Sequence, residues 1–255
     1  MKKLIVTADD FGWTKSTNDG IIRAVKEGMV TDIAVMVLAD PQDVDHGLKL
    51  LRDNKITEIG LHTCLFKWGK TERPHRQDFI NFFKSASDAE IEDVVLSEIE
   101  VYKKLLGVNP KFISPQFNMH GNLRLLKVLA KYTVDNNIPM RIPRAVLTSD
   151  EITDQNYASE IYLKRLKVKM TNHLFAHILG SYSTEIINNF IGDLKTVVDG
   201  ETTELVFHPG YCDQDALESS SLNFERARDL SILKNPDFKQ QIVDLGFTFS
   251  HMSDL

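Results

Sequence analysis

Short apolar runs alternate along the chain with longer segments whose apolar residues recur at helical spacing. This alternation is typical of βαβ units, in which each buried parallel strand is followed by a helix that packs against the sheet. The run at 111–117 is the weakest strand candidate, because Pro115 interrupts it. We predict strands at about 3–8, 32–39, 58–65, 111–117, 139–144, 204–211 and 247–252.

The helical segments carry recognisable ends. The polar run at 16–19 supplies capping residues for a first helix, Pro41 occupies a first-turn position of a second, and Gly107 ends another. Residues 66–87 show little periodicity, and we expect a long loop of the kind that serves as a lid or binding loop. We predict further helices over 88–106, 123–134, much of 158–179, 184–198, 224–233 and 236–245.

Strands alternating with helices predict the α/β class. We expect a (β/α) barrel, and an open doubly wound sheet is the alternative. The chain has 255 residues, of which 42% are hydrophobic. Barrels of this length are commonly one domain, so we expect residues 1–255 to form a single domain.

Charge and composition narrow the range of partners. The formal net charge of −6 gives no electrostatic footprint for nucleic acid or for an anionic membrane surface. No segment has the length of a signal-peptide core or of a membrane span, so we expect a cytoplasmic protein with a small-molecule or sugar partner. Cys64 and Cys212 form no CxxC pair, and we expect both to be buried, reduced packing residues. The oligomeric state stays open, with a homodimer among the options.

Chemically active side chains follow the predicted strands at their carboxyl ends. Barrels and open α/β sheets both build their sites at this edge. The first predicted strand is followed by two adjacent carboxylates, which is unusual because like charges in contact repel. The candidates are Asp9, Asp10, His62, His120, Arg141, Arg144 and His208.

Each candidate also has a structural interpretation. One of the two aspartates could cap the following helix, and His62 could be a core histidine that bonds a carbonyl. His208 precedes Pro209 and Gly210, so it could be a turn residue, and the two arginines could pair with surface acids. We interpret the remaining histidines as hydrogen-bonded or surface residues: His46, His75, His173, His177 and His251.

Metal-assisted hydrolysis accounts for these residues jointly. A divalent metal held by one carboxylate and one or two imidazoles keeps open positions for water and substrate. A second carboxylate beside that metal can accept the proton of the attacking water, which gives the adjacent aspartates two different roles. A histidine opposite can protonate a leaving amine, while the metal or an arginine holds the oxyanion.

Four motifs together resemble the YdjC-like family, the chitooligosaccharide deacetylases. They are TADDFG after the first strand, GLH in the third, RIPR after a helix and FHPG late in the chain. The resemblance spans Leu4 to Tyr211 and implies a distorted (β/α) barrel. It also implies a divalent metal, Mg²⁺ or Zn²⁺, and removal of acetyl groups from N-acetylated sugars, typically short chitooligosaccharides.

The resemblance also implies residue roles. Asp9 would be the general base and His208 the general acid. Asp10 and His62 would be metal ligands. The arginines that orient the base or the substrate in this family correspond to Arg141 and Arg144.

One segment departs from the family pattern. Family members carry a D-S-H-x-H-x-H segment after the fourth strand, whereas this chain reads ISPQFNMHGN. Gln116 falls at the first histidine, the usual third metal ligand, Ser114 falls at the aspartate, and only His120 is retained. The third ligand would then be the amide oxygen of Gln116 or the ring of His120, and a weakly bound metal is expected.

These observations leave three hypotheses for the function. The first is a metal-dependent deacetylase of an N-acetylated mono- or oligosaccharide, phosphorylated or not. The second is a noncatalytic relative that binds sugar without metal. The third is a metal-dependent hydrolase of another bond, such as a phosphoester.

Overall fold

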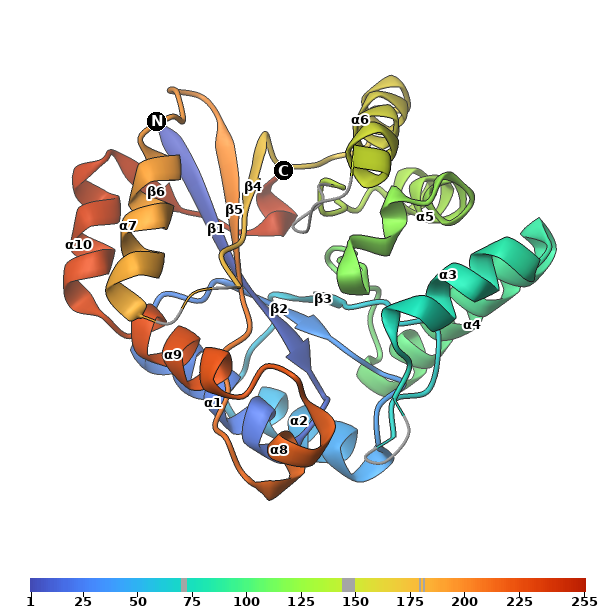
Figure 1. The fold of residues 1–255 in the computed structure, drawn as a ribbon, viewed down its shortest axis with the longest axis horizontal. Coiled ribbons are helices and arrows are strands. Elements are labelled where there is room, and N and C mark those ends of the chain that lie inside the picture. The colour runs from blue at the N-terminus through green and yellow to red at the C-terminus, as the bar shows by residue number, and fades with distance from the viewer. Residues whose placement is uncertain (70–72, 144–149, 179, 181) are drawn as a thin grey trace.

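The computed structural model describes the chain except residues 70–72, 144–149, 179 and 181. Its centre is a parallel sheet of six strands in the order β3-β2-β1-β5-β4, with β6 paired to the start of β1 (Figure 1). The strands are β1 (Lys2–Phe11), β2 (Asp32–Val35), β3 (Ile59–Leu61), β4 (His173–Phe175), β5 (Thr202–Phe207) and β6 (Phe247–Phe249).

Two single bridges continue the sheet beyond β3. Leu61 pairs with Ile113, and Ile113 pairs with Met140, both in parallel. The predicted strands at 111–117 and 139–144 are therefore reduced to one paired residue each. No further bridge among the described residues joins Met140 to β4, so the curved sheet is a distorted, incomplete (β/α) barrel, and the predicted α/β class is confirmed.

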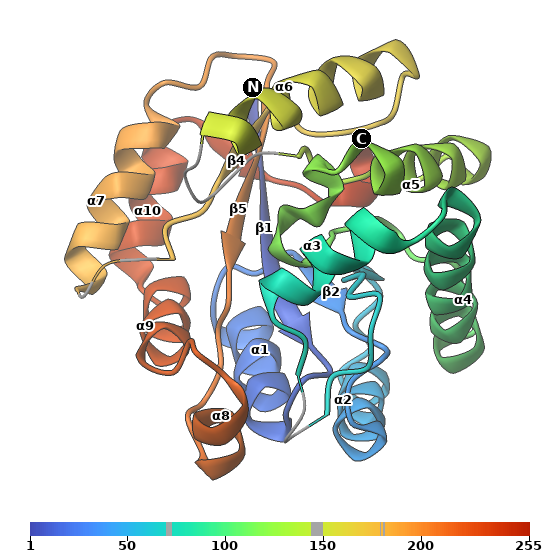
Figure 2. The ribbon, with the colours of Figure 1, turned by 45° about the vertical axis from the view of Figure 1, so that its right-hand side comes forward.

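Helices surround this sheet on its outer side (Figure 2). Among the described residues, no helix combines the length and the apolar character that crossing a membrane requires. The α-helices are α1 (Lys15–Glu27), α2 (Pro41–Asp53), α3 (Arg76–Ser85), α4 (Asp88–Leu106), α5 (Leu123–Asn136), α6 (Asp150–Arg165), α7 (Ser183–Leu194), α8 (Gln214–Ser219), α9 (Phe224–Leu233) and α10 (Pro236–Asp244). Two 3₁₀ segments are η1 (Gln116–Gly121) and η2 (Met252–Asp254).

Two predictions about secondary structure were wrong. The helix expected over 158–179 ends at Arg165, and β4 follows within the same segment, because Lys167 has a left-handed φ of 56° that stops the helix. The loop expected over 66–87 contains α3, whose buried Phe79 and Phe83 lie one helical turn apart. Three strand residues are too few for their alternation to show in a sequence, and two aromatic residues are too few for helical periodicity.

Alternate residues of β1 have different surroundings. Leu4, Val6 and Ala8 belong to the large cluster that packs against the helices. Ile5 belongs instead to a small cluster with Ala34, Phe112 and Met252. Since side chains alternate across a strand, Ile5 and Asp9 share the inner face. The interior therefore holds the first aspartate at one end and is filled at the other end by the fully buried Met252 of η2.

Helix α1 fixes the segment that follows β5. The amide of Tyr211 donates to the carbonyl of Ser16 at 3.1 Å, and a Cβ on Gly20 would lie 2.5 Å from the Cα of Gly210. No other residue type fits at position 20 without moving this segment. The close approach places His208, two residues before Gly210, at the carboxyl end of β1.

We predict that Gly20→Ala lowers the free energy of unfolding by about 1–3 kcal/mol, because the added methyl group overlaps backbone atoms. The matched control is Gly192→Ala on α7, where a Cβ meets nothing within 4 Å. It should raise the free energy of unfolding by up to about 1 kcal/mol through helix propensity. Urea denaturation measures both, and equal effects of the two variants would contradict the close approach.

Candidate active site

The two adjacent aspartates lie at the end of β1 and are buried, at 2% exposure for Asp9 and 1% for Asp10. Asp9 has the extended conformation of the strand, whereas Asp10 has a left-handed φ of 70°. Few residues other than glycine adopt such a φ, and aspartate is among those that tolerate it. The change of backbone conformation directs the two carboxylates to different partners.

Asp9 is held by a buried ion-pair network. Arg141 donates through Nη1 and Nη2 to the two carboxylate oxygens at 2.6 and 2.9 Å. The same guanidinium donates through Nε and Nη2 to Oε1 of Glu204 on β5, at 2.9 and 2.6 Å. Burial alone would raise the pKa of Asp9, but the charge of Arg141 and its hydrogen bonds hold the pKa below its usual value. Burial keeps the pKa of Glu204 raised in spite of the same arginine.

Asp10 has a different arginine and one unused oxygen. Arg226, from α9, donates to Oδ2 at 2.7 Å and stacks over the ring of Trp13 at 4.8 Å. Burial opposes ionisation of Asp10, but Arg226 and His62 lower its pKa far below the usual value. Within the described part of the chain, Oδ1 is buried without a hydrogen-bond partner, and it lies 3.4 Å from Nε2 of His62.

His62 lies between the two aspartates. Its Nδ1 is 3.1 Å from the hydroxyl of Ser114 and 4.0 Å from Oδ2 of Asp9, while its Nε2 contacts Oε1 of Gln116. Burial lowers the pKa of His62, but the carboxylates of Asp9 and Asp10 outweigh it, so the pKa is raised. Nε2 faces two oxygen atoms, Oδ1 of Asp10 and Oε1 of Gln116.

The residues at this point fit a divalent cation. Oδ1 of Asp10, Nε2 of His62 and Oε1 of Gln116 converge, and the carboxylate oxygen has no other partner. Carboxylate, imidazole and amide oxygen are all metal ligands, and a cation between them would satisfy the carboxylate oxygen that lacks a hydrogen bond.

A buried glutamate fixes the loop after His62. Glu98, on α4, accepts from the amides of Cys64 and Leu65 at 2.8 and 3.0 Å and from the hydroxyl of Thr63. Burial raises the pKa of Glu98 and of the neighbouring thiol. The buried, free Cys64 agrees with the prediction, whereas Cys212 is exposed, because it lies in the surface segment between β5 and α8.

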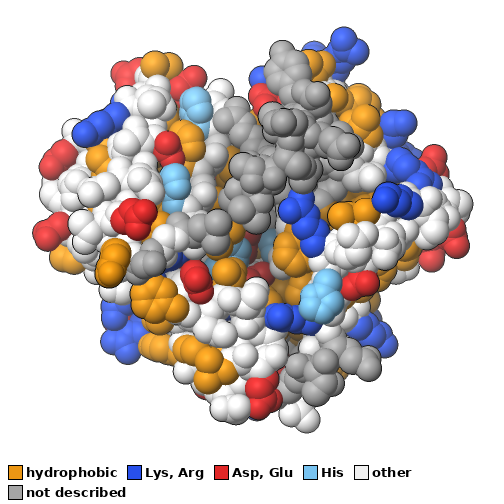
Figure 3. All heavy atoms as spheres, viewed as in Figure 1, with side chains coloured by type: hydrophobic (Ala, Val, Ile, Leu, Met, Phe, Trp, Pro, Cys, Tyr) orange, Lys and Arg blue, Asp and Glu red, His pale blue; other side chains and the backbone are white. Residues whose placement is uncertain are grey.

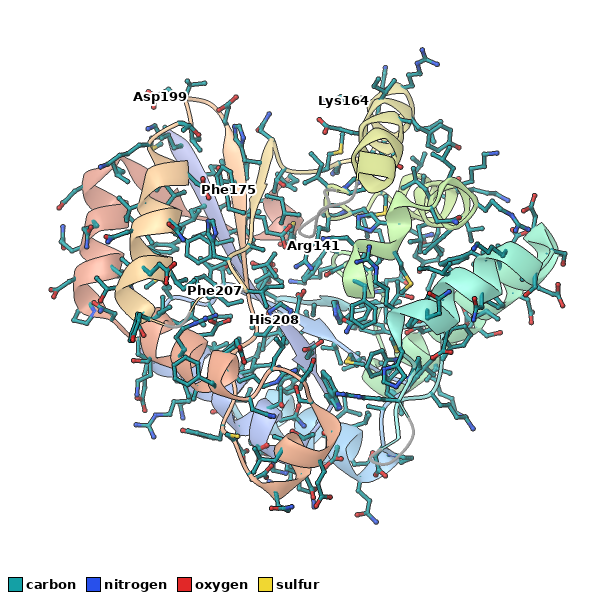
Figure 4. All side chains as sticks on the ribbon, in the orientation of Figure 1. Arg141, Lys164, Phe175, Asp199, Phe207 and His208 are labelled. Carbon is teal, nitrogen blue, oxygen red and sulfur yellow. The ribbon has the colours of Figure 1, made fainter. Side chains whose placement is uncertain are left out.

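His208 follows β5 and lies near Arg141 at the centre of the molecule (Figure 4). Its amide donates to Oδ2 of Asp229 at 2.9 Å, and its Nδ1 is buried without a hydrogen-bond partner. Its charge is close enough to Asp9 and Asp10 to affect their pKa values. His208 is therefore brought to the aspartates, with a ring nitrogen available.

Two further predicted residues are placed differently. His120 is buried, and its Nε2 donates to the backbone carbonyl of Arg141 at 3.1 Å. Burial lowers the pKa of His120 to about 3, so the ring is neutral. No group of three His, Cys, Asp or Glu ligands that includes His62 converges within 4.8 Å in the described part of the chain. Arg144 lies outside the described residues.

Aromatic side chains line one side of the site. Trp13 and Trp68 meet edge to face with ring centroids 5.3 Å apart, and both indole nitrogens are buried without acceptors. Phe117 follows Gln116, packs 6.1 Å from Trp68 and remains 46% exposed. Histidine and acidic side chains lie in the recessed centre of this face (Figure 3). A polar face beside an exposed ring and unused donors is suited to a sugar.

Sequence reasoning missed Glu204, Arg226 and Glu98. Glu204 did carry a signal, because a charged residue within an apolar strand four positions before His208 must share its face. Arg226 and Glu98 carried none, since each lies on a helix where a charged residue is usually solvated.

We predict that Arg141→Met lowers the free energy of unfolding by about 3–5 kcal/mol, because Asp9 and Glu204 would keep buried charges without a partner. Adding Asp9→Asn and Glu204→Gln should recover much of that loss. Arg23→Met is the control, since Arg23 pairs with Glu27 at the surface and should change stability little. Urea denaturation that gave the same midpoint for all of these variants would contradict the network.

Comparison with known proteins identifies the family of the chain. The family model described as YdjC-like protein matches residues 3–244. A carbohydrate deacetylase of Clostridium beijerinckii is 27% identical over 99% of this chain and 100% of its own length. One of Brevibacillus brevis is 26% identical over 99% of both chains.

Solved structures share the fold. A protein of Enterococcus faecalis V583, described as a candidate cellobiose-phosphate cleavage protein, superposes with a TM-score of 0.78 at 22% identity, over 99% of this chain and 98% of that one. The Xyl-CE4 domain of a xylanase from the hindgut metagenome of Trinervitermes trinervoides gives 0.54 at 13% identity, over 100% and 89%. With the family model covering nearly its whole length, the chain belongs to the YdjC-like protein family.

Proposed function

We propose that this protein is a metal-dependent carbohydrate deacetylase that removes acetyl groups from N-acetylated mono- or oligosaccharides. One observation carries the proposal: the adjacent aspartates have separate environments. Arg141 neutralises Asp9, whereas Asp10 directs an unpartnered oxygen toward His62 and Gln116. Membership of a family whose relatives are named carbohydrate deacetylases supports the choice of reaction.

Asp10, His62 and Gln116 would hold the metal. A divalent cation bound there supplies a Lewis acid that polarises the acetyl carbonyl and lowers the pKa of a water. Two of the three ligand atoms are oxygens, and this set favours Mg²⁺ or Mn²⁺ over Zn²⁺ more than a set with two imidazoles would.

Asp9 would act as the base. It accepts the proton of the water that attacks the amide carbonyl, and its bidentate contact with Arg141 fixes the direction of both oxygens. Because Arg141 keeps the pKa of Asp9 low, the carboxylate is ionised and ready to accept at neutral pH. Asp9 lies 4.0 Å from Nδ1 of His62, and it would stay bound to Arg141 when Nε2 of the same ring binds the metal.

His208 would donate a proton to the nitrogen of the leaving amine. His208 directly follows β5, the strand that pairs with β1. Its amide donates a hydrogen bond to Asp229. The C–N bond then breaks, and acetate and the free amino sugar are released. The exposed ring of Phe117 would contact the sugar through its apolar face, and the buried Trp68 packs behind it.

A second function has one observation in its favour. Gln116 is neutral and a weaker ligand than an imidazole, which favours a noncatalytic relative that binds sugar without metal. Acetate release distinguishes the two functions. The protein is incubated with N-acetylglucosamine and its short β-1,4 oligomers, with Mg²⁺, Mn²⁺ or Zn²⁺ and with a chelator. The deacetylase releases acetate only with metal, whereas the noncatalytic relative binds the sugars and releases none.

We predict that Asp9→Asn and Asp10→Asn impair different properties of the enzyme, kcat in the first variant and metal binding in the second. Asp10→Asn should weaken metal binding and abolish acetate release, because an amide oxygen is a neutral ligand. Asp9→Asn should keep the metal affinity and lower kcat by about 10²–10⁴-fold, the usual contribution of a general base. Calorimetric titration with Mn²⁺ and an acetate assay measure the two effects.

Asp229→Asn is a control that keeps the acceptor for the His208 amide without changing either aspartate of β1. Equal loss of metal from the Asp9 and Asp10 variants, or unchanged turnover in either of them, would show that the two roles are assigned wrongly.

A further inference from the structure

A second group of ligand-type side chains lies at the other end of the barrel interior. Asp32 begins β2, Glu58 precedes β3 and His251 precedes η2. One ligand atom from each lies within 4.8 Å of the other two. In Figures 1 and 2 the C-terminus lies at the end of the sheet opposite the carboxyl ends of the strands. This group is therefore separate from the candidate active site.

Asp32 is the unusual member, because its side chain is fully buried. Oδ1 accepts the amide hydrogen of Met252 at 3.1 Å, but Oδ2 has no hydrogen-bond partner. Nδ1 of His251 lies 3.4 Å from that oxygen and also lacks a hydrogen-bond partner. Burial of a carboxylate is unfavourable, and it raises the pKa of Asp32 to about 6 in spite of the nearby His251. Two ligand atoms therefore face each other at this point without a hydrogen bond, as they would around a cation.

Glu58 has two partners of its own. Lys111 pairs with Oε1 of Glu58, and the hydroxyl of Ser253 donates to Oε2 at 2.8 Å. One lysine balances one of the two carboxylates. Oε2 can exchange the hydroxyl of Ser253 for a stronger partner, because a hydroxyl rotates freely.

We propose that Asp32, Glu58 and His251 form a structural site for a divalent transition metal, with Zn²⁺ as the best match. An imidazole and two carboxylates are ordinary zinc ligands, and a water completes four-coordination. The side chains of His251 and Glu58 are 42% and 22% exposed, which gives the ion a route of entry. The sequence alone interprets His251 as a hydrogen-bonded or surface residue, because its partners Asp32 and Glu58 lie about two hundred positions away.

The bound metal would fasten the C-terminal turn to the sheet. Met252, between His251 and Ser253, fills the interior beside Ile5, Ala34 and Phe112. A metal that binds only the folded state stabilises that state by an amount that grows with the logarithm of the metal concentration above Kd. Zinc at about a hundred times its Kd should therefore raise Tm by about 5–10 °C in a chain of this size.

The test uses the Asp10→Asn/His62→Gln variant, which lacks the proposed catalytic ligands. Calorimetry should find one equivalent of Zn²⁺, and added Zn²⁺ should raise Tm. Adding His251→Gln should remove both effects, and so should adding Asp32→Asn, which keeps an oxygen for Met252. His173→Gln is the matched control, because His173 also pairs with a glutamate, Glu201, at 2.8 Å but lies outside the group.

The proposal is wrong if the double variant binds no Zn²⁺, which would leave Asp32 and His251 as a simple ion pair. It is also wrong if binding survives His251→Gln, since the ion would then occupy another place. If the double variant does not fold, the comparison uses the wild type and its His251→Gln variant. The wild type must then bind one more equivalent of Zn²⁺ than the variant. His251→Gln should leave acetate release unchanged, so this test succeeds or fails independently of the proposed function.

Discussion

Two ionised carboxylates on consecutive residues are buried at the end of β1, and the site depends on keeping them charged and apart. Two arginines distant in sequence do this: Arg141 binds Asp9, and Arg226 binds Asp10. Taking such pairs out of water costs as much free energy as their attraction returns, so stability alone does not explain them. The left-handed backbone of Asp10 adds a further local cost. This free-energy cost is understandable if one carboxylate binds a metal ion and the other accepts a proton.

The rest of the fold maintains that separation. Side chains alternate along β1, so that Leu4, Val6 and Ala8 pack into the large core and Asp9 lies on the inner face. There Asp9 shares Arg141 with Glu204 of β5. Glu98 holds the loop after His62 through two backbone amides. The contact of α1 with the segment after β5 fixes His208. Each support comes from a different element, which explains why the site requires nearly the whole chain.

The sequence predicted the α/β class and the edge of the sheet at which the candidate residues gather, because strand ends and buried runs are local signals. It could not predict β4, since three residues show no periodicity, or α3, whose apolar pattern is two phenylalanines. Pairing between distant residues was equally hidden. Nothing near position 226 indicates a partner at position 10, and nothing near position 251 indicates one at position 32. For Gln116, alignment with the family motif left two choices, and its contact with His62 appears only in three dimensions.

The central claim is that Asp10 binds the metal and that its neighbour Asp9 acts as the general base. The most direct measurement is an anomalous difference map from crystals of the wild-type protein soaked in Mn²⁺. The account predicts a peak about 2.0–2.4 Å from Oδ1 of Asp10, Nε2 of His62 and Oε1 of Gln116, with Asp9 still bound to Arg141. A peak coordinated by Asp9, or no peak beside Asp10 at saturating Mn²⁺, would contradict it.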